Sequence, residues 1–221
     1  YIRKVADQQS WASQGAGAGV EIARIRLATD RFLQAASLTA GADAGRQAVR
    51  YELFDQIQSL FGDPGADSGF FSQIDSIFSA FTTSAENATS GALRQDAVWK
   101  TQAAFDEAAR ISKSIQGARE EADGRIRTAI DRTNGLLEQI EKLNVDIAKA
   151  NVVGTDSTGA QTIQATLINE LAEIMDVRVT NRSVGGVEVR TGAGILLAGQ
   201  GATTLEYKPA GIVSSETVFN Q

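Results

Sequence analysis

Apolar residues recur at helical spacing along a proline-free stretch that runs from Ser90 to Asn151. From Ile115 onward the steps between them are sevens, fours and threes, so these residues share one face of a helix. Glu138, Glu141 and Lys142 fall between them and are expected on the opposite, solvated face. The pattern predicts one helix of about 60 residues, roughly 90 Å long at ~1.5 Å per residue. The apolar series reads Ile115, Ala122, Ile126, Ile130, Leu137, Ile140 and Ile147.

A second long helix is predicted before it, over residues 29–61. Thr29 is a favourable N-cap residue for this helix, and Phe61 precedes a Gly-Asp-Pro-Gly turn. The glycines of residues 41–45 each cost about 1 kcal/mol relative to alanine in a helix interior. We expect tertiary packing to offset that cost, so the helix is predicted to be continuous.

Two shorter helices complete the predicted helical part. The phenylalanine-rich residues 70–81 form an amphipathic helix that is expected to pack against the long one. Residues 162–175 form another, with Thr162 as its cap. Trp99 and Phe105 of the long helix are expected in the core.

The pattern of apolar and polar residues changes after residue 176. Val177-Arg178-Val179 and Val187-Glu188-Val189 alternate apolar and polar residues, and Gly185-Gly186 lies between them. Two glycines between alternating segments are typical of a β-hairpin. With a third strand at residues 195–197, the pattern predicts a small antiparallel sheet.

The N-terminal residues carry weaker signals. Alternating glycines at residues 15–19 precede the strand-like residues 20–25. A nucleotide-binding glycine loop would follow a strand and open a helix. The order here is the reverse, which favours a turn or linker.

The predicted fold class is mainly α with a small β part. It is an elongated antiparallel helical bundle built on one long helix, with a short antiparallel β-sheet near the C-terminal end. We expect an extended lead-in at 1–19 and a helical bundle domain with one N-terminal strand at 20–176. The sheet of the same domain covers 177–204, and 205–221 form a tail or the start of a further β-rich domain. The chain lacks an initiator methionine and is expected to be a piece of a longer one.

One polar residue interrupts the apolar stripe. Asn144 continues the spacing of Leu137, Ile140 and Ile147. A single amide in an apolar helix seam lowers stability but fixes the register of the paired helices. Asn144→Leu is therefore expected to raise the melting temperature. The predicted structural helix seam consists of Ile126, Ile130, Leu137, Ile140, Asn144 and Ile147.

Composition narrows the possible chemistry. The 221 residues contain no cysteine and no histidine, which excludes thiolate nucleophiles, Ser-His-Asp triads and zinc sites with Cys or His ligands.

The net charge of −6 argues against nucleic-acid binding. No apolar run approaches the ~18 residues of a membrane span. The acidic residues 120–123 lie among arginines and are expected to form a solvated surface. We predict no catalytic residue, cofactor or metal.

Several stretches together match one family. Gly17-Ala18-Gly19-Val20-Glu21-Ile22 resembles the family pattern Gly-x-Gly-Val-x-Val, and Leu171-Ala172-Glu173-Ile174 resembles its passage from helix to strand. The most specific match is Ile140-Glu141-Lys142-Leu143-Asn144-Val145-Asp146-Ile147, which is similar to Ile-x-x-Leu-Asn-x-x-Ile. Tyr1-Ile2-Arg3-Lys4 resembles the segment after the family's N-terminal signature. The family is that of flagellar hook-associated protein 1 (FlgK), the hook–filament junction proteins. One departure is Ile163-Gln164-Ala165-Thr166, where the family usually carries Leu-Leu-Asp-Gln-Arg-Asp.

The resemblance implies a non-enzymatic adaptor between the flagellar hook and filament. Its partners would be the hook protein and neighbouring hook-associated subunits, with an export chaperone for the full-length protein. It implies an extracellular location at the hook–filament junction, reached by type III export without a cleavable signal peptide. Terminal segments that drive stacking in the family would be missing, so this piece is expected to be monomeric in isolation.

Two other functions stay open from the sequence. One is another hook-associated or type III secreted rod-like structural protein, which paired terminal heptad segments of a full-length chain would distinguish. The other, which the sequence favours least, is a carboxylate-dependent cell-wall glycosidase. That enzyme would need two acids facing each other across a cleft, and no pair on separate elements stands out.

Overall fold

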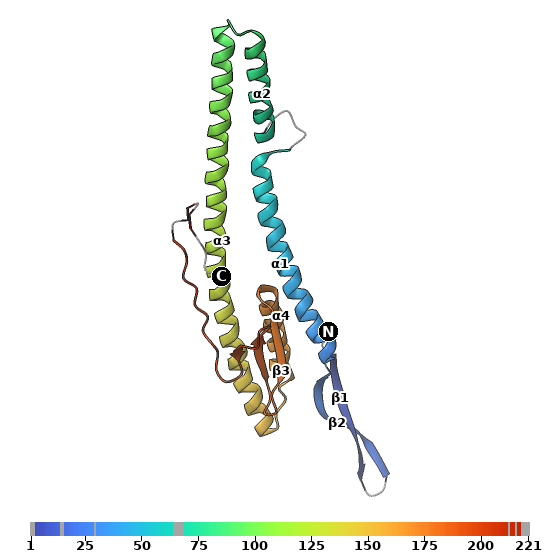
Figure 1. The fold of residues 1–221 in the computed structure, drawn as a ribbon. Helices are drawn as coiled ribbons and strands as arrows, with labels where there is room; N and C mark the ends of the chain where they lie inside the picture. Colours follow the sequence, from blue (N-terminus) through green and yellow to red (C-terminus); the bar gives the residue numbers. More distant parts are fainter. Residues whose placement is uncertain are drawn as a thin grey trace. The chain divides into compact units, whose positions relative to one another are not determined.

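The computed structural model describes residues 3–13, 16–28, 30–63, 69–211, 213–214 and 216–217. Within these ranges the chain forms four helices and five strands (Figure 1). The prediction of a mainly α protein with a small antiparallel sheet near its C-terminal end is confirmed. The helices are α1 (Arg31–Phe61), α2 (Phe70–Glu86), α3 (Gly91–Val153) and α4 (Thr158–Ile174). The strands are β1 (Arg3–Ser13), β2 (Ala16–Ala28), β3 (Val177–Asn181), β4 (Val187–Thr191) and β5 (Leu196–Ala198).

Contacts divide the chain into two compact units. Unit 1 contains Tyr1–Gln47 and Thr128–Tyr207, and unit 2 contains Ala48–Arg127 and Lys208–Gln221. Both long helices contribute residues to both units.

The longest element matches its prediction. Helix α3 contains 63 residues and is continuous from Gly91 to Val153. Ser90 occupies its N-cap position and accepts a hydrogen bond from the Leu93 N–H at its Oγ (3.4 Å).

Helix α1 is also continuous through residues 41–45, as predicted. Its cap is Asp30, whose Oδ1 accepts hydrogen bonds from the N–H groups of Phe32 (2.9 Å) and Leu33 (3.1 Å). The predicted cap, Thr29, lies outside the described residues. Close packing explains the glycine at position 45, because a Cβ on Gly45 would overlap the backbone carbonyl oxygen of Glu173 in α4. A glycine therefore allows α1 and α4 to approach closely here.

Unit 1 has its core between helices and the C-terminal sheet. The strand order is β3-β4-β5, with all neighbours antiparallel. Residues 182–186 connect β3 to β4 in the predicted hairpin, and its two glycines, Gly185 and Gly186, have φ of 103° and 76°. The buried apolar cluster draws on α1, α3, α4 and all three strands, and includes Leu38, Leu137, Ile140, Ile168, Leu171, Val177, Val189 and Leu197.

Helix α4 begins at Thr158, four residues before its predicted start. Asp156 determines this start, because its Oδ1 accepts a hydrogen bond from the Thr158 N–H (2.9 Å). Thr162 lies inside the helix and donates its hydroxyl to the Thr158 carbonyl (2.8 Å). A threonine within a helix can return its hydroxyl to the preceding turn, so its presence did not identify the cap.

The N-terminal residues differ from their prediction in one respect. An extended lead-in over residues 1–19 and a single strand after it were expected, whereas β1 and β2 form an antiparallel hairpin from Arg3↔Ala28 to Ser13↔Ala16. The pairing register shifts between Asp7 and Gln8 and again between Trp11 and Ala12. Such irregularities break the two-residue alternation by which strands are recognised.

In unit 2, the packed face of α3 follows a seven-residue repeat of mostly small side chains. Its buried apolar residues are Ala97, Ala104, Ile111 and Ala118. Trp99 and Phe105 were expected in the core but are 63% and 70% exposed. They lie two and one residues after members of the repeat, and successive helical residues are about 100° apart, so they point away from its face.

The predicted phenylalanine packing is found for part of the group. The rings of Phe61, Phe70 and Phe71 lie with centroids 5.9–6.3 Å apart, in edge-to-face and stacked arrangements. Phe78 and Phe81, further along α2, are largely exposed. The aromatic cluster therefore covers the junction between α1 and α2 rather than the whole of α2.

Candidate functional site

The structure separates the predicted seam residues into two groups. Four of them, Leu137, Ile140, Asn144 and Ile147, are no more than 1% exposed. Ile130 is half-buried, and Ile126 is 44% exposed, so its prediction as a seam residue is wrong. The reason is geometric: eight residues separate Ile126 from the buried Ala118, which places it about 80° around the helix from the packed face.

The buried group faces the sheet as well as other helices. Asn144 Nδ2 donates to the Val187 carbonyl (2.9 Å), and Asn144 Oδ1 accepts from the Val187 N–H (2.7 Å). The side-chain amide therefore pairs with both backbone groups of one β4 residue, as a neighbouring strand would. Strand β5 is paired with β4 only at Val189 and Arg190, so it does not cover Val187. Asn144 replaces the missing strand.

Two further polar side chains complete this buried node. Gln164 of α4 is 3% exposed and donates from Nε2 to Asn144 Oδ1 (2.9 Å) and to the Ile140 carbonyl (3.3 Å). Asn144 Nδ2 also donates to Glu141 Oε2 (2.9 Å). Each buried amide is thus satisfied by partners from α3, α4 or β4, which a stable buried polar group requires.

Glu141 has a structural role that its predicted solvated position did not suggest. Its Oε2 accepts from the Gly199 N–H (2.8 Å), and its Oε1 accepts from the Gly201 N–H (3.1 Å). A carboxylate with two backbone donors holds the loop after β5 onto α3. The prediction failed because periodicity places charged residues outside unless a loop brings donors to them.

Asn134 repeats the arrangement of Asn144 ten residues earlier. Its Nδ2 donates to the Leu205 carbonyl (2.9 Å), and its Oδ1 accepts from the Leu205 N–H (2.8 Å). Asn134, Glu141, Asn144 and Asn151 are separated by seven, three and seven residues, a helical spacing. This polar row is visible in the sequence as a spacing beside the apolar stripe.

Unit 2 uses the same kind of contact. Arg119 donates from Nη1 to the Ser214 carbonyl (2.9 Å) and from Nη2 to the Thr217 carbonyl (2.7 Å). Asp123, buried on α3, accepts from the Ala210 N–H (3.2 Å) at Oδ1. Both side chains hold backbone that belongs to no helix or strand.

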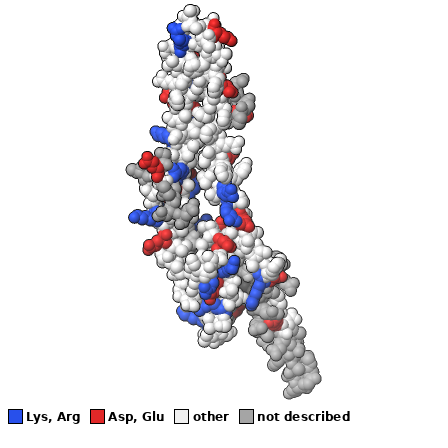
Figure 2. Space-filling model, in the orientation of Figure 1, with Lys and Arg blue, Asp and Glu red and all other residues white. Residues whose placement is uncertain are grey.

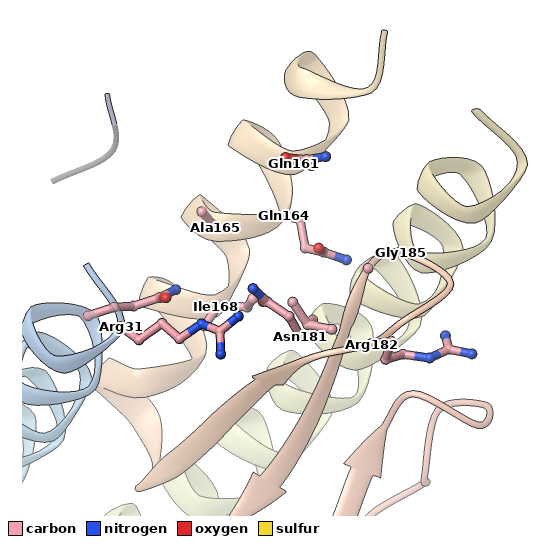
Figure 3. Close-up of a pocket in the computed structure, with 11 residues that line it drawn as sticks. Arg31, Gln161, Gln164, Ala165, Ile168, Asn181, Arg182 and Gly185 are labelled. Carbon is pink, nitrogen blue, oxygen red and sulfur yellow. The ribbon is translucent and has the colours of Figure 1, made fainter. Parts of the chain in front are cut away.

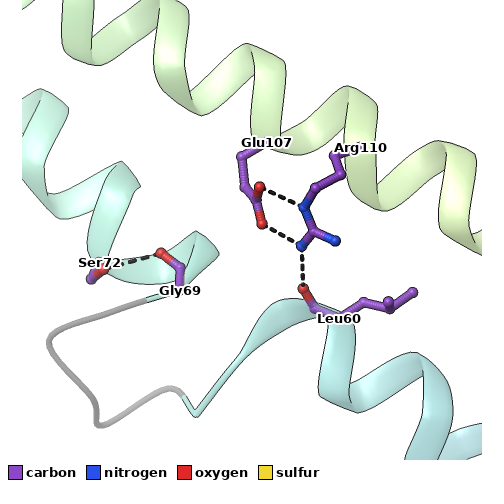
Figure 4. Close-up of polar contacts among 5 residues, drawn as sticks. All are labelled: Leu60, Gly69, Ser72, Glu107 and Arg110. Carbon is purple, nitrogen blue, oxygen red and sulfur yellow. Dashed lines mark hydrogen bonds and ion pairs between the residues drawn. The ribbon is translucent and has the colours of Figure 1, made fainter.

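Ion pairs on unit 2 link its helices. Arg110 forms two hydrogen bonds with Glu107, and its Nη2 also donates to the Leu60 carbonyl at the end of α1 (3.4 Å, Figure 4). On the other side of the α1–α2 loop, Ser72 Oγ donates to the Gly69 carbonyl (3.0 Å) at the start of α2 (Figure 4). The hydrogen bonds from Arg110 lower the pKa of Glu107, although partial desolvation opposes them.

A second arginine bridges two helices. Arg125 donates from Nη2 to Glu121 (2.7 Å) on its own helix and to Glu52 (2.9 Å) on α1. Its hydrogen bond and its charge lower the pKa of Glu52. Figure 2 shows basic and acidic residues interspersed on the visible face rather than collected by sign. The arginines thus lower the pKa of both Glu52 and Glu107, whereas a general acid needs its pKa raised.

The described residues hold no group of three or more His, Cys, Asp or Glu residues arranged to bind a metal ion. None of the helices in the described ranges combines the length and the apolar character needed to cross a membrane. The arrangement found is one of side chains holding backbone, so its evident capacity is to fix the shape of the chain.

Comparisons with known proteins identify relatives of this arrangement. The family model for the flagellar hook-associated protein FlgK helical domain matches residues 54–219. Flagellar hook-associated protein 1 of Bacillus subtilis (strain 168) is 24% identical over 170 residues, which cover 77% of this chain and 33% of the relative. The protein of the same name from Escherichia coli (strain K12) is 22% identical over 204 residues, 91% of this chain and 37% of the relative.

A solved structure shares the fold. The flagellar hook junction protein FlgK from Burkholderia pseudomallei aligns with a TM-score of 0.64 at 21% identity, over 75% of this chain and 28% of that one. This chain therefore spans 28–37% of the length of these relatives.

Proposed function

The chain belongs to the FlgK helical-domain family, and from this membership we propose that it is part of a non-enzymatic structural protein of the bacterial flagellum. In this proposal the protein connects the hook to the filament and is needed for filament assembly. The observation that carries it is the family match over residues 54–219, which includes the whole of α3 and the whole C-terminal sheet. The solved hook junction protein with the same fold supports it further.

The contacts along α3 suit such a role. Asn134, Glu141 and Asn144 each hold backbone from a different part of the segment after α4. Hydrogen bonds of a charged or buried group with backbone are directional and are lost only when the local packing opens. A domain built this way keeps its shape under mechanical force better than one held by apolar contacts alone, because shear must break several directional bonds together.

The proposed partners are the flagellar hook protein and neighbouring hook-associated subunits, with an export chaperone for the full-length protein. The proposed location is extracellular, at the hook–filament junction, after type III export without a cleavable signal peptide. The absence of cysteine supports this route, because a chain that is exported unfolded gains by having no thiol to cross-link. Neither nucleic acid nor a membrane is a proposed partner.

We further propose that the protein has no catalytic activity. A chain without histidine or cysteine lacks the most common general base and the most reactive nucleophile. The two carboxylates with altered pKa values, Glu52 and Glu107, are shifted downward by arginines. A glycosidase acid would need its pKa raised instead.

Deletion of the gene, followed by electron microscopy of the cells, tests the junction role. We expect hooks without filaments and filament protein released into the medium, with both defects repaired by a plasmid-borne copy. Normal filaments on normal hooks would reject the role.

Sedimentation of the 221-residue chain tests a second part of the proposal, its oligomeric state. It is expected to show a monomer at low micromolar concentration, and a stable multimer would contradict that part of the proposal.

A further inference from the structure

None of the described strands pairs with the outer edge of strand β3. In the sheet order β3-β4-β5, β3 is a terminal strand, and the hairpin β1–β2 forms a separate sheet. Hydrogen bonds from Arg182 N to Gly186 O and from Gly192 N to Asp176 O lie at the two ends of the β3–β4 pairing. In antiparallel strands, residues that bond to the partner alternate with residues whose backbone points away. The outward groups are therefore those of Val177, Val179 and Asn181.

A groove runs along this edge. One cavity of about 300 Å³ is lined by all five residues of β3 and by the first turns of α1. A second cavity of about 350 Å³ continues toward the β3–β4 turn and α4. The two share Arg31, Gln34 and Asn181 in their walls. Figure 3 shows the second cavity, with the Arg31 guanidinium reaching from α1 toward Asn181 at the end of β3. We call the two cavities together the edge groove.

The edge groove is basic although the chain is acidic. Among the described residues that line it there is no aspartate or glutamate, whereas Arg31 and Arg178 contribute cations. The chain as a whole carries a net charge of −6. The groove therefore complements a negatively charged segment and discriminates against positively charged ones.

Amide side chains add a second kind of complementarity. Gln34, Gln161 and Asn181 line the groove. Elsewhere in this protein, Asn134 and Asn144 use the same group to hold an extended backbone by paired hydrogen bonds. The groove thus offers an extended chain one wall of strand backbone and another of amides.

We propose that the edge groove binds an extended acidic segment of a partner protein, which adds to the sheet as a fourth strand beside β3. Main-chain hydrogen bonds to Val177, Val179 and Asn181 would supply affinity, and Arg31 and Arg178 would select carboxylates on the segment. A second copy of this chain is a poorer occupant. Its own hairpin sequence, residues 3–28, contains four basic residues (Arg3, Lys4, Arg24 and Arg26) and two acidic ones (Asp7 and Glu21), so 4 − 2 gives a net charge of +2 and the groove would repel a donated strand.

The proposal does not depend on the junction role and stands if that role is rejected.

The test uses the 221-residue chain and a fluorescein-labelled peptide of alternating valine and glutamate, followed by fluorescence polarisation and amide NMR. We expect saturable binding, with shifts at the amides of Val177, Val179 and Asn181 that exceed those at Arg178 and Thr180. A peptide with lysine in place of glutamate should bind at least tenfold more weakly. No saturation up to millimolar peptide, or equal binding of the two peptides, would overturn the proposal.

Variants locate the binding. Arg31→Glu combined with Arg178→Glu should weaken acidic-peptide binding at least tenfold, whereas Lys142→Glu, an exposed α3 residue outside the groove, should leave it unchanged. Val179→Pro removes one outward N–H at a position where an edge strand tolerates proline, and should also weaken binding at least tenfold. Circular dichroism establishes that each variant is folded. Concentration-dependent dimers that Val179→Pro abolishes would overturn the choice of occupant in favour of a second copy.

Discussion

Asn144 of α3 and Val187 of β4 are joined by two hydrogen bonds, one in each direction between the side-chain amide and the backbone of Val187. Both residues are at most 8% exposed. The pairing attaches the sheet to the long helix at a point 43 residues away along the sequence. Asn144 therefore attaches the sheet to the long helix, in addition to the hydrogen bond that it accepts from Gln164 of α4.

This geometry reverses the stability expected for Asn144→Leu. Leucine would leave the N–H and C=O of Val187 and the amide of Gln164 without their partner in a buried site, and each unsatisfied group costs about 1–3 kcal/mol. We expect the free energy of unfolding to fall by about 2–4 kcal/mol. Urea denaturation followed by circular dichroism measures it. A variant as stable as the parent, or more stable, would restore the original seam interpretation.

Asn151→Leu is the matched control for that substitution. Asn151 lies seven residues further along α3 but is exposed, and its hydrogen bonds with the Val184 carbonyl and with Ser157 Oγ are both long, at 3.5 Å. The same change of side chain should alter the free energy of unfolding by no more than about 0.5 kcal/mol.

Periodicity predicted the helices well because a helix face is a local property. The apolar steps through Leu137, Ile140 and Ile147 depend only on neighbours within a few turns. The backbone partners of Asn134, Glu141 and Asn144 include Leu205, Gly199 and Val187, which lie 43 to 71 residues away. No pattern within one helix specifies which backbone will reach it, so this polar row could be seen from sequence only as a spacing.

Ile140 and Ile126 test which part of the apolar stripe is buried. Ile140 is fully buried, and Ile140→Asp would place an unpaired carboxylate in the core of unit 1. We expect it to lower the free energy of unfolding by about 3–5 kcal/mol. Ile126→Asp, at a residue 44% exposed, should change it by less than about 1 kcal/mol. Thermal unfolding of both variants decides the matter, and similar losses would mean that the two residues belong to one seam.

Two glycines of α1 are expected to respond oppositely to the same substitution. Gly41→Ala adds a methyl group to open space and should stabilise the helix by about 0.5–1 kcal/mol. Gly45→Ala would force the Cβ into the Glu173 carbonyl oxygen, and overpacking of this kind costs about 1–3 kcal/mol. Gly41→Ala should therefore raise the denaturant midpoint above that of the parent, and Gly45→Ala should lower it. Stabilisation by both substitutions would show that α1 and α4 do not approach closely at Gly45.

Glu52 provides a test of the ion pairs on unit 2 through pH. The hydrogen bond from Arg125 lowers the pKa of Glu52 below its ordinary value of 4.5, and the charge of Arg125 lowers it further. A carboxylate whose pKa is lower in the folded state contributes stability above its unfolded pKa. That contribution is lost as the pH falls from about 4.5 through the lowered folded pKa.

NMR titration of the side-chain carboxyl should therefore place the Glu52 midpoint below 4.5 in the parent. Arg125→Gln should return it toward that value, and Arg127→Gln, which changes an exposed arginine two residues away, should leave it where it is. Added salt should raise the midpoint in the parent, since both partners are exposed and their attraction is screened. If the Glu52 midpoint of the parent lay at 4.5 and changed neither with Arg125→Gln nor with added salt, the bridge between α1 and α3 would not form in solution.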